Sequence, residues 1–130
     1  MPIHHAMLGT LPTTTERTFT PLATPALGTA SCSVHENILN VGAVVPLHKH
    51  PIEEVIVCLS GAGECTFENQ EPQAYRAGSV LVIPAGTVHT LRNVGTERLC
   101  QLAFLAGPEP GTQWLQPEGS VAKLRQSTDA

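Results

Sequence analysis

Charged and aromatic residues are both scarce in this chain of 130 residues. Charged residues make up 14% of the sequence and aromatic residues 4%, whereas hydrophobic residues make up 42%. This balance excludes a disordered chain, because disordered segments combine low hydrophobicity with high charge. Seven Lys and Arg are outnumbered by eleven Asp and Glu. Since they also form no basic run, we expect neither a nucleic acid nor an anionic membrane as a partner.

Long apolar runs and paired cysteines are also missing. No apolar stretch reaches the roughly 18 residues of a membrane span, and the first residues lack the charged and apolar regions of a signal peptide. We therefore expect no membrane association and a cytoplasmic protein. The four cysteines include no CxxC pair, which argues against a zinc knuckle or a dithiol redox site. They are expected to be buried thiols: Cys32, Cys58, Cys65 and Cys100.

Glycine and proline, eleven of each, interrupt the sequence every few residues. Between them lie short apolar runs that recur at about the spacing of strands in β-sandwiches and barrels. These runs are 31–34, 38–45, 55–59, 65–67, 80–83, 87–91 and 99–105. Because none is long enough for a helix, the sequence predicts an all-β fold.

The mass of 13.8 kDa corresponds to one domain. Residues 1–29 are rich in Thr and Pro and are expected to form an N-terminal arm or edge strand. Residues 30–107 are expected to form the barrel core. Residues 108–130 resume loop character and are assigned as a C-terminal extension.

A glycine-containing turn centred on Ala62 predicts a hairpin between two apolar runs. Its register places Cys58 opposite Cys65, close enough for a cross-strand disulfide if their Cα atoms lie within about 7 Å. In a reducing cytoplasm, free thiols are the commoner outcome. We therefore expect two neighbouring free cysteines.

A second turn at residues 95–96 predicts another hairpin. It would pair His89 near Leu102 and turn alternate residues of the following strand inward. The expected inner residues are Cys100, Leu102 and Phe104. A largely apolar pocket would follow from this register.

Two of the six histidines, His48 and His50, lie two residues apart at the end of an apolar run. Residues two apart on a strand point to the same face, so both imidazoles face one side of the sheet. Glu54 has the same parity and Glu53 the opposite one. If the chain stays extended past Pro51, Glu54 faces the histidines.

His89 follows a second apolar run and completes a set of three imidazoles and one carboxylate. Such mixed nitrogen and oxygen donors suit a divalent transition metal. An octahedral ion would keep two positions open for substrate, water or dioxygen. Each histidine alone reads more simply as a surface residue, and only the combination favours a metal site.

The spacing of these residues and the surrounding glycines forms two motifs. The first comprises Gly42, His48, His50, Glu54 and Gly61. Five residues separate Gly42 from His48, three separate His50 from Glu54, and six separate Glu54 from Gly61. The second comprises Gly78, Pro84, Gly86, His89 and Asn93. Together they resemble the two conserved motifs of the cupin superfamily at every defining position. The resemblance extends over residues 42–93.

The resemblance implies an all-β double-stranded β-helix, also called a jelly-roll barrel. It also implies that one divalent transition metal per chain, Fe, Mn, Ni or Zn, is held by the matching residues: His48, His50, Glu54 and His89. Asn93 is expected to fix a loop. Small cupins commonly form dimers through their sheets, so we expect a homodimer.

Enzymes and binding proteins share this fold, so several functions stay open. A metalloenzyme acting on a small organic substrate is expected, nominally a dioxygenase for a carbonyl or phenolic compound. An isomerase or lyase is an alternative, as is a non-catalytic small-ligand-binding or sensor protein. These alternatives differ in what surrounds the metal, not in the metal residues themselves.

Other polar residues have a weaker claim to a function. Arg76 and Arg92 are candidates to hold a substrate carboxylate, although solvated surface arginines are the commoner case. Tyr75, Cys100 and His35 could act in chemistry, but packing roles are favoured for all three.

Overall fold

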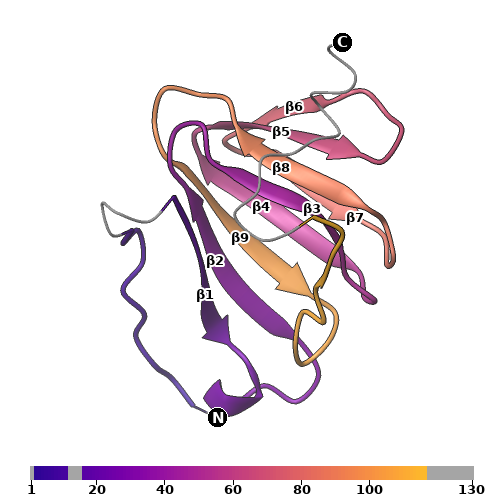
Figure 1. The fold of residues 1–130 in the computed structure, drawn as a ribbon. Coiled ribbons are helices and arrows are strands. Elements are labelled where there is room, and N and C mark those ends of the chain that lie inside the picture. The colour runs from indigo at the N-terminus through magenta and orange to yellow at the C-terminus, as the bar shows by residue number, and fades with distance from the viewer. Residues whose placement is uncertain (1, 12–15, 117–130) are drawn as a thin grey trace.

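Two antiparallel sheets of five strands each face one another in the computed structural model, which describes residues 2–11 and 16–116 (Figure 1). The first sheet has the spatial order β1 (Arg17–Ala23), β2 (Ser33–Leu39), β9 (Leu99–Leu105), β4 (Glu54–Ser60) and β7 (Val80–Ile83). The second has the order β10 (Gln113–Trp114), β3 (Val44–Lys49), β8 (His89–Asn93), β5 (Ala62–Phe67) and β6 (Gln73–Arg76). The all-β prediction is confirmed.

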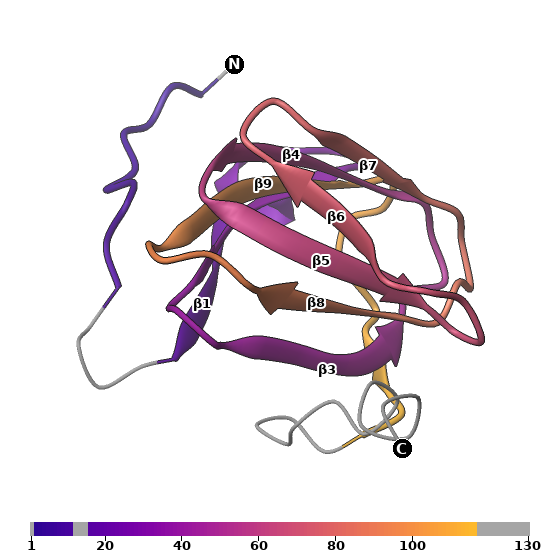
Figure 2. The same ribbon diagram turned by 90° about the horizontal axis from the view of Figure 1, so that it is seen from above.

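Between β3 and β9 only β5 and β6 form a hairpin, because the chain otherwise crosses from one sheet to the other after each strand (Figure 2). The first sheet contains β4, β7 and β9, and the second contains β3, β5, β6 and β8. A short 3-10 helix, η1 (Pro25–Leu27), connects β1 to β2. Strand β1 lies at one edge of the first sheet and β10 at one edge of the second, so residues from both ends of the described chain join the sheets.

The predicted hairpin around Ala62 is wrong. Strand β4 pairs with β7 and β9, so Cys58 lies opposite Gln101 and not opposite Cys65. The turn at Gly61 leads the chain from one sheet to the other. Its φ of 90° favours glycine, and a Cβ there would lie 2.5 Å from the carbonyl oxygen of Arg98. Both cysteines are buried free thiols, as expected, whereas Cys32 is exposed.

The second predicted hairpin is wrong for the same reason. Strand β8 pairs with β3 and β5, so His89 lies opposite His48 and Phe67. The inward residues of β9 are therefore shifted by one position from the prediction: Leu99, Gln101, Ala103 and Leu105 are buried. Phe104 is instead 41% exposed.

Turns also divide the apolar run at 38–45. Strand β2 ends at Leu39 and β3 begins at Val44, with Gly42 at a φ of 80° between them. Asn93 fixes a nearby loop, as predicted. Its side-chain amide donates to the carbonyls of Leu39 (3.0 Å) and Glu97 (2.9 Å), and its Oδ1 accepts from the amide of Gly95 (2.9 Å).

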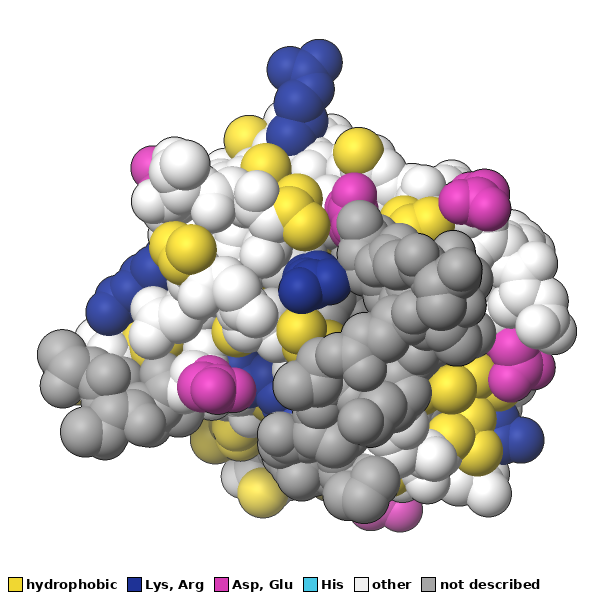
Figure 3. All heavy atoms as spheres, turned by 45° about the horizontal axis from the view of Figure 1, so that its top comes forward, with side chains coloured by type: hydrophobic (Ala, Val, Ile, Leu, Met, Phe, Trp, Pro, Cys, Tyr) yellow, Lys and Arg dark blue, Asp and Glu magenta, His cyan; other side chains and the backbone are white. Residues whose placement is uncertain are grey.

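The hydrophobic core fills one part of the space between the sheets. Its fully buried members include Leu39, Ile56, Ile83 and Leu99, and burying each such side chain contributes about 1.5–3 kcal/mol. The outer surface is mixed, with hydrophobic side chains beside acidic and basic ones on the face drawn in Figure 3. Within the described part of the chain, no helix has the length and apolarity to cross a membrane.

Candidate metal centre

The structure brings the four predicted metal residues together between the sheets. His48 lies on β3, His50 directly follows that strand, and His89 is the first residue of β8. Glu54 is the first residue of β4, on the opposite sheet. One ligand atom from each of the four residues lies within 4.8 Å of the others, and all four side chains are buried. This group could hold a metal ion.

The chain does not stay extended over residues 50–54, as the sequence analysis assumed, but Glu54 still faces the histidines as expected. The chain bends after β3 and enters the first sheet at Glu54. The bend is held in part by the amide of Gly86, which donates to the carbonyl of His50 at 2.7 Å. Glu54 therefore faces the imidazoles from the opposite sheet, while Glu53 is exposed.

Each imidazole is oriented by a backbone carbonyl. The Nδ1 of His48 lies 2.7 Å from the Pro46 oxygen and that of His89 lies 2.8 Å from the Thr87 oxygen. The Nδ1 of His50 lies 3.0 Å from the carbonyl of Pro110. Because a carbonyl oxygen can only accept, each Nδ1 carries the proton and each Nε2 keeps a lone pair. Metal-binding histidines are commonly fixed in this way.

Two polar atoms of the group have no hydrogen-bond partner among the described residues. They are Glu54 Oε1 and His89 Nε2, both buried. The carboxylate oxygen lies 3.5 Å from His89 Nε2 and 3.5 Å from His50 Nε2. A buried polar atom without a partner costs about 1–3 kcal/mol. A bound cation would satisfy both atoms, so the residues fit a metal.

Burial also favours the neutral imidazoles that a metal requires. Desolvation, together with a smaller effect of the neighbouring His89, lowers the pKa of His48 to about 3. Burial lowers the pKa of His50 as well, although Glu54 opposes this shift. At neutral pH both rings therefore keep the lone pair available for a metal.

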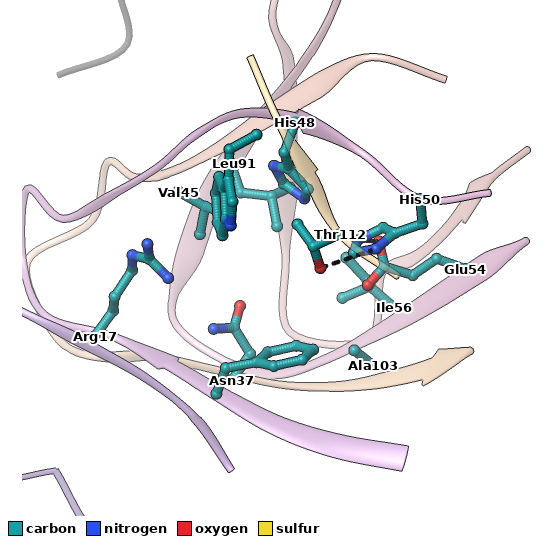
Figure 4. Close-up of a pocket in the computed structure, with 12 residues that line it drawn as sticks. Arg17, Asn37, Val45, His48, His50, Glu54, Ile56, Leu91, Ala103 and Thr112 are labelled. Carbon is teal, nitrogen blue, oxygen red and sulfur yellow. Dashed lines mark hydrogen bonds and ion pairs between the residues drawn. The ribbon is translucent and has the colours of Figure 1, made fainter. Parts of the chain in front are cut away.

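A cavity of about 120 Å³ opens directly beside this group (Figure 4). Its wall includes His48, His50 and Glu54. The remaining lining residues are Arg17, Phe19, Asn37, Val45, Ile56, Leu91, Ala103, Thr112 and Trp114. The wall is apolar in the middle, as expected, but it carries polar groups that the sequence reasoning missed.

The missed residues come mainly from the two edge strands and the segment before β10. Arg17 and Phe19 belong to β1, and Thr112 and Trp114 to the segment ending in β10. The Thr112 hydroxyl lies 3.3 Å from His50 Nδ1. Only the uniqueness of Trp114 in the sequence could have drawn attention to this segment.

The other predicted candidates do not line this cavity. Arg76 is exposed on β6 and Arg92 is half-buried on β8. Cys100 is half-buried. His35 is buried and stacks against Phe19, with ring centroids 4.3 Å apart. Tyr75 is also buried, so the packing roles favoured for His35 and Tyr75 agree with their environments.

A buried hydrogen-bond chain crosses the space between the sheets behind the cavity. The Tyr75 hydroxyl donates to Gln101 Oε1 (2.9 Å), and Gln101 Nε2 donates to Asn37 Oδ1 (2.7 Å). Asn37 Nδ2 in turn donates to the carbonyl of Thr18 (2.8 Å). This amide network holds edge strand β1 against the barrel.

A family model for the cupin domain matches residues 36–104, which is more than half of the chain. The chain belongs to the cupin family. The matched region contains all four residues of the candidate metal centre, whereas Arg17, Thr112 and Trp114 lie outside it.

Curated relatives of this cupin include plant proteins. It is 34% identical over 94 residues to germin-like protein 5-1 of Oryza sativa, covering 67% of this chain and 41% of that protein. It is 35% identical over 79 residues to germin-like protein 8-14 of the same species, covering 56% of this chain and 37% of that protein. The chain thus spans about two fifths of the length of these relatives.

Solved structures share the fold. A double-stranded β-helix protein from Klebsiella pneumoniae superposes with a TM-score of 0.72 at 20% identity, covering 82% of this cupin and 90% of that chain. An oxalate oxidase in complex with glycolate superposes with a TM-score of 0.71 at 23% identity, covering 80% of this cupin and 57% of that chain. A DMSP lyase from Ruegeria pomeroyi superposes with a TM-score of 0.62 at 26% identity, covering 71% of this cupin and 47% of that chain.

Proposed function

We propose that this cupin is a metal-dependent enzyme that binds one divalent transition metal per chain through His48, His50, Glu54 and His89. The observation that carries this proposal is the pair of buried, unpartnered atoms Glu54 Oε1 and His89 Nε2 beside an open cavity. A structural metal site would be closed, whereas a catalytic site keeps access to substrate. The donor set accepts Fe, Mn, Ni or Zn.

The cavity wall favours chemistry at the metal. When bound, the metal would supply Lewis acidity or redox capacity to a substrate in the cavity. Among the described lining residues, Arg17 is the only charged group apart from the proposed metal residues His48, His50 and Glu54. Phe19, Ile56 and Leu91 exclude water from the substrate. An oxygenase needs little more from the protein, so a dioxygenase is our nominal assignment.

An isomerase or lyase would require a separate proton-transfer group near the substrate. The lining residues that the structure describes offer none beyond the metal residues, which counts against that alternative. The fold itself does not decide, because structures similar to this cupin include both an oxidase and a lyase.

A non-catalytic ligand-binding cupin is the second candidate. The same scarcity of acid and base groups favours it, since a binding protein has no need of them. The two candidates are distinguished by turnover, because an enzyme converts its bound ligand into a product and a binding protein does not.

The test begins with elemental analysis of the purified, tag-free protein. Anaerobic loading with Fe(II), Mn(II) or Ni(II) is followed by oxygen-uptake assays with small carbonyl and phenolic compounds. About one metal per chain with metal-dependent uptake would support a cupin dioxygenase. One metal without uptake would favour an isomerase, a lyase or the binding protein over the dioxygenase, and absence of metal would overturn the site.

We also propose a homodimer formed through the outer face of the first sheet. Val55 lies opposite Phe104 and Val82, and Val57 lies opposite Val80, so the outward side chains form apolar rows. Val80 and Val82 are each 59% exposed. Contiguous exposed apolar surface marks interaction sites, and a two-fold axis would pair these rows with their own copy.

Light scattering tests the homodimer. The wild type is expected at twice the chain mass of 13.8 kDa and Val82→Glu at the monomer mass, because the new charge would be buried in the interface. A monomeric wild type, or a Val82→Glu protein that stays dimeric, would contradict the proposal.

A further inference from the structure

Two apolar pairs of residues lie on opposite sides of the cavity (Figure 4). In the first sheet, Ile56 on β4 is paired with Ala103 on β9. In the second sheet, Val45 on β3 is paired with Leu91 on β8. Because the two sheets face one another, these four residues bound a slot that has an apolar wall on each side.

Ala103 provides the space in this slot. It is the smallest of the residues that line the cavity, and it is buried at 1% exposure. Its neighbours on the same face of β9, Gln101 and Leu105, are larger and also buried. Since protein interiors are close-packed, a larger side chain at position 103 would fill the gap between the sheets.

Two aromatic residues form the rim of the slot. Phe19 on β1 is 38% exposed and Trp114 on β10 is 36% exposed, and both line the cavity. They therefore lie where the cavity meets solvent. The Phe19 ring is stacked on the His35 ring at 4.3 Å, with 9° between the two planes. This contact holds the Phe19 ring in place as a flat part of the wall.

The polar atoms that still lack a partner lie at one end of the cavity. Asn37 is already hydrogen-bonded to the side chain of Gln101. Arg17 is also engaged, because its guanidinium carbon lies 5.5 Å from the centre of the Trp114 ring and it has a further interaction. At the opposite end, Glu54 Oε1 is buried without a hydrogen-bond partner among the described residues. The cavity therefore suits a ligand with an apolar body and one polar end.

We propose that the slot binds a single-ring aromatic compound whose hydroxyl group is directed at the metal residues, that is, a phenol. This inference rests on the proposed function and narrows its substrate class. The cavity of about 120 Å³ is close in size to an apolar protein cavity of roughly 150 Å³ that binds benzene. A flat ring contacts the apolar walls with both faces and pairs with the Phe19 ring at the rim. The hydroxyl group supplies the polar partner that the other end lacks.

Calorimetric titration tests this class of ligand. The probes are phenol and cyclohexanol, which share the ring size and the single hydroxyl group but differ in aromaticity. Both are titrated into protein loaded with Zn²⁺, a metal without redox chemistry, and into metal-free protein. Zinc content and the thermal unfolding midpoint are measured for every preparation. The wild type is expected to bind phenol more tightly than cyclohexanol.

Phe19→Leu removes the aromatic ring from the rim but keeps an apolar side chain. It should weaken phenol binding by about 3-fold to 10-fold, the range for loss of an aromatic pair, and leave cyclohexanol binding nearly unchanged. The matched control is Phe104→Leu. Phe104 is similarly exposed, at 41%, but it is not among the residues that line the cavity. This variant should bind phenol like the wild type.

Ala103→Leu fills the slot between the sheets. It should weaken binding of both probes by more than about 10-fold, because the apolar space that buries the ring is lost. Ala103→Val adds less volume and should give a smaller loss. It replaces the leucine variant if the latter has a lower unfolding midpoint.

Equal affinity of the wild type for phenol and cyclohexanol would overturn the inference. Phenol binding that is unchanged in both Phe19→Leu and Ala103→Val would also overturn it, provided that zinc content and unfolding midpoints are normal. If zinc fails to bind but the metal-free protein binds phenol with the same dependence on Phe19, the inference stands and the metalloenzyme proposal fails. Zinc binding with phenol affinity independent of Phe19 and Ala103 gives the reverse result.

Discussion

The two sheets contribute to the candidate site in different ways. The second sheet carries His48 and His89 on neighbouring strands, and both rings are fixed by the carbonyl two residues earlier in the chain. The first sheet contributes Glu54 and Asn37. Asn37 is fixed by Gln101, which lies 64 positions away in the sequence. Imidazole orientation is thus largely local, whereas the opposite wall depends on long-range contacts.

This difference separates metal binding from ligand selection. A short local pattern suffices to present nitrogen donors, so it can recur in proteins with different reactions. The wall that faces the substrate depends on how distant strands meet, and it can change without disturbing the donors. The predictions below perturb first one sheet or the other and finally the segment before β10.

The largest effect is expected from His89→Ala, in the second sheet. Loss of one of four ligands should weaken metal binding by more than about 100-fold, because even residues that only orient ligands contribute about 10-fold to 100-fold. Competition with a chelator measures the affinity. The exposed His5 offers the matched control, and His5→Ala should bind metal normally. Unchanged affinity in His89→Ala would contradict the site.

Gln101→Leu perturbs the network of the first sheet. It leaves the Tyr75 hydroxyl and Asn37 Oδ1 without their partners, and each buried group costs about 1–3 kcal/mol. We expect the free energy of unfolding to fall by about 3 kcal/mol in urea denaturation. Cys100→Ala, on the same strand but on its other face, should lose clearly less. Equal losses in the two variants would show that the network is not what stabilises this wall.

Acid should destabilise the metal-free protein because His48, on the second sheet, is buried in its neutral form. Burial lowers the pKa of His48 from 6.5 to about 3, so below pH 6.5 the unfolded chain binds a proton that the folded chain does not. Stability is therefore complete above pH 6.5 and falls as the pH decreases towards 3. The expected loss from His48 is about 2 kcal/mol between pH 7 and pH 5.

Urea denaturation at several pH values measures this slope. His48→Gln removes the titrating group and should flatten the slope relative to the wild type. An identical slope in both proteins would assign the acid sensitivity to other groups.

The smallest effect is expected from Thr112→Val. The Thr112 hydroxyl lies 3.3 Å from His50 Nδ1, but the Pro110 carbonyl at 3.0 Å already holds that nitrogen. Metal affinity should fall by less than about 10-fold. Replacing the exposed Thr20 by Val provides the control. A loss as large as that of His89→Ala would mean that Thr112 has a greater role than orientation.

The sequence predicted the local part of the site and failed for the rest. His48, His50, Glu54 and His89 follow from spacing within two short segments. The pairing of Cys58 and the inward face of β9 were predicted wrongly, because turns that look like hairpins carry the chain between sheets. No local pattern could reveal this, since sheet membership depends on contacts between distant strands.

Arg17 and Trp114 illustrate the same limit. They lie 97 positions apart by their residue numbers, and neither belongs to a recognisable motif. Their contact exists only because β1 and β10 are edge strands on opposite sheets beside one cavity. Segments that composition marks as an arm and an extension thus supply part of the cavity wall.

The position of β10 bears on the order in which the protein matures during synthesis. Translation is vectorial, and a ribosome releases residues 48–89 before the segment at 110–114 that contacts His50 and lines the cavity. All four donor side chains are therefore synthesised before this part of the cavity wall. A metal site in a chain that ended before residue 110 would lack the carbonyl of Pro110 that holds the His50 ring.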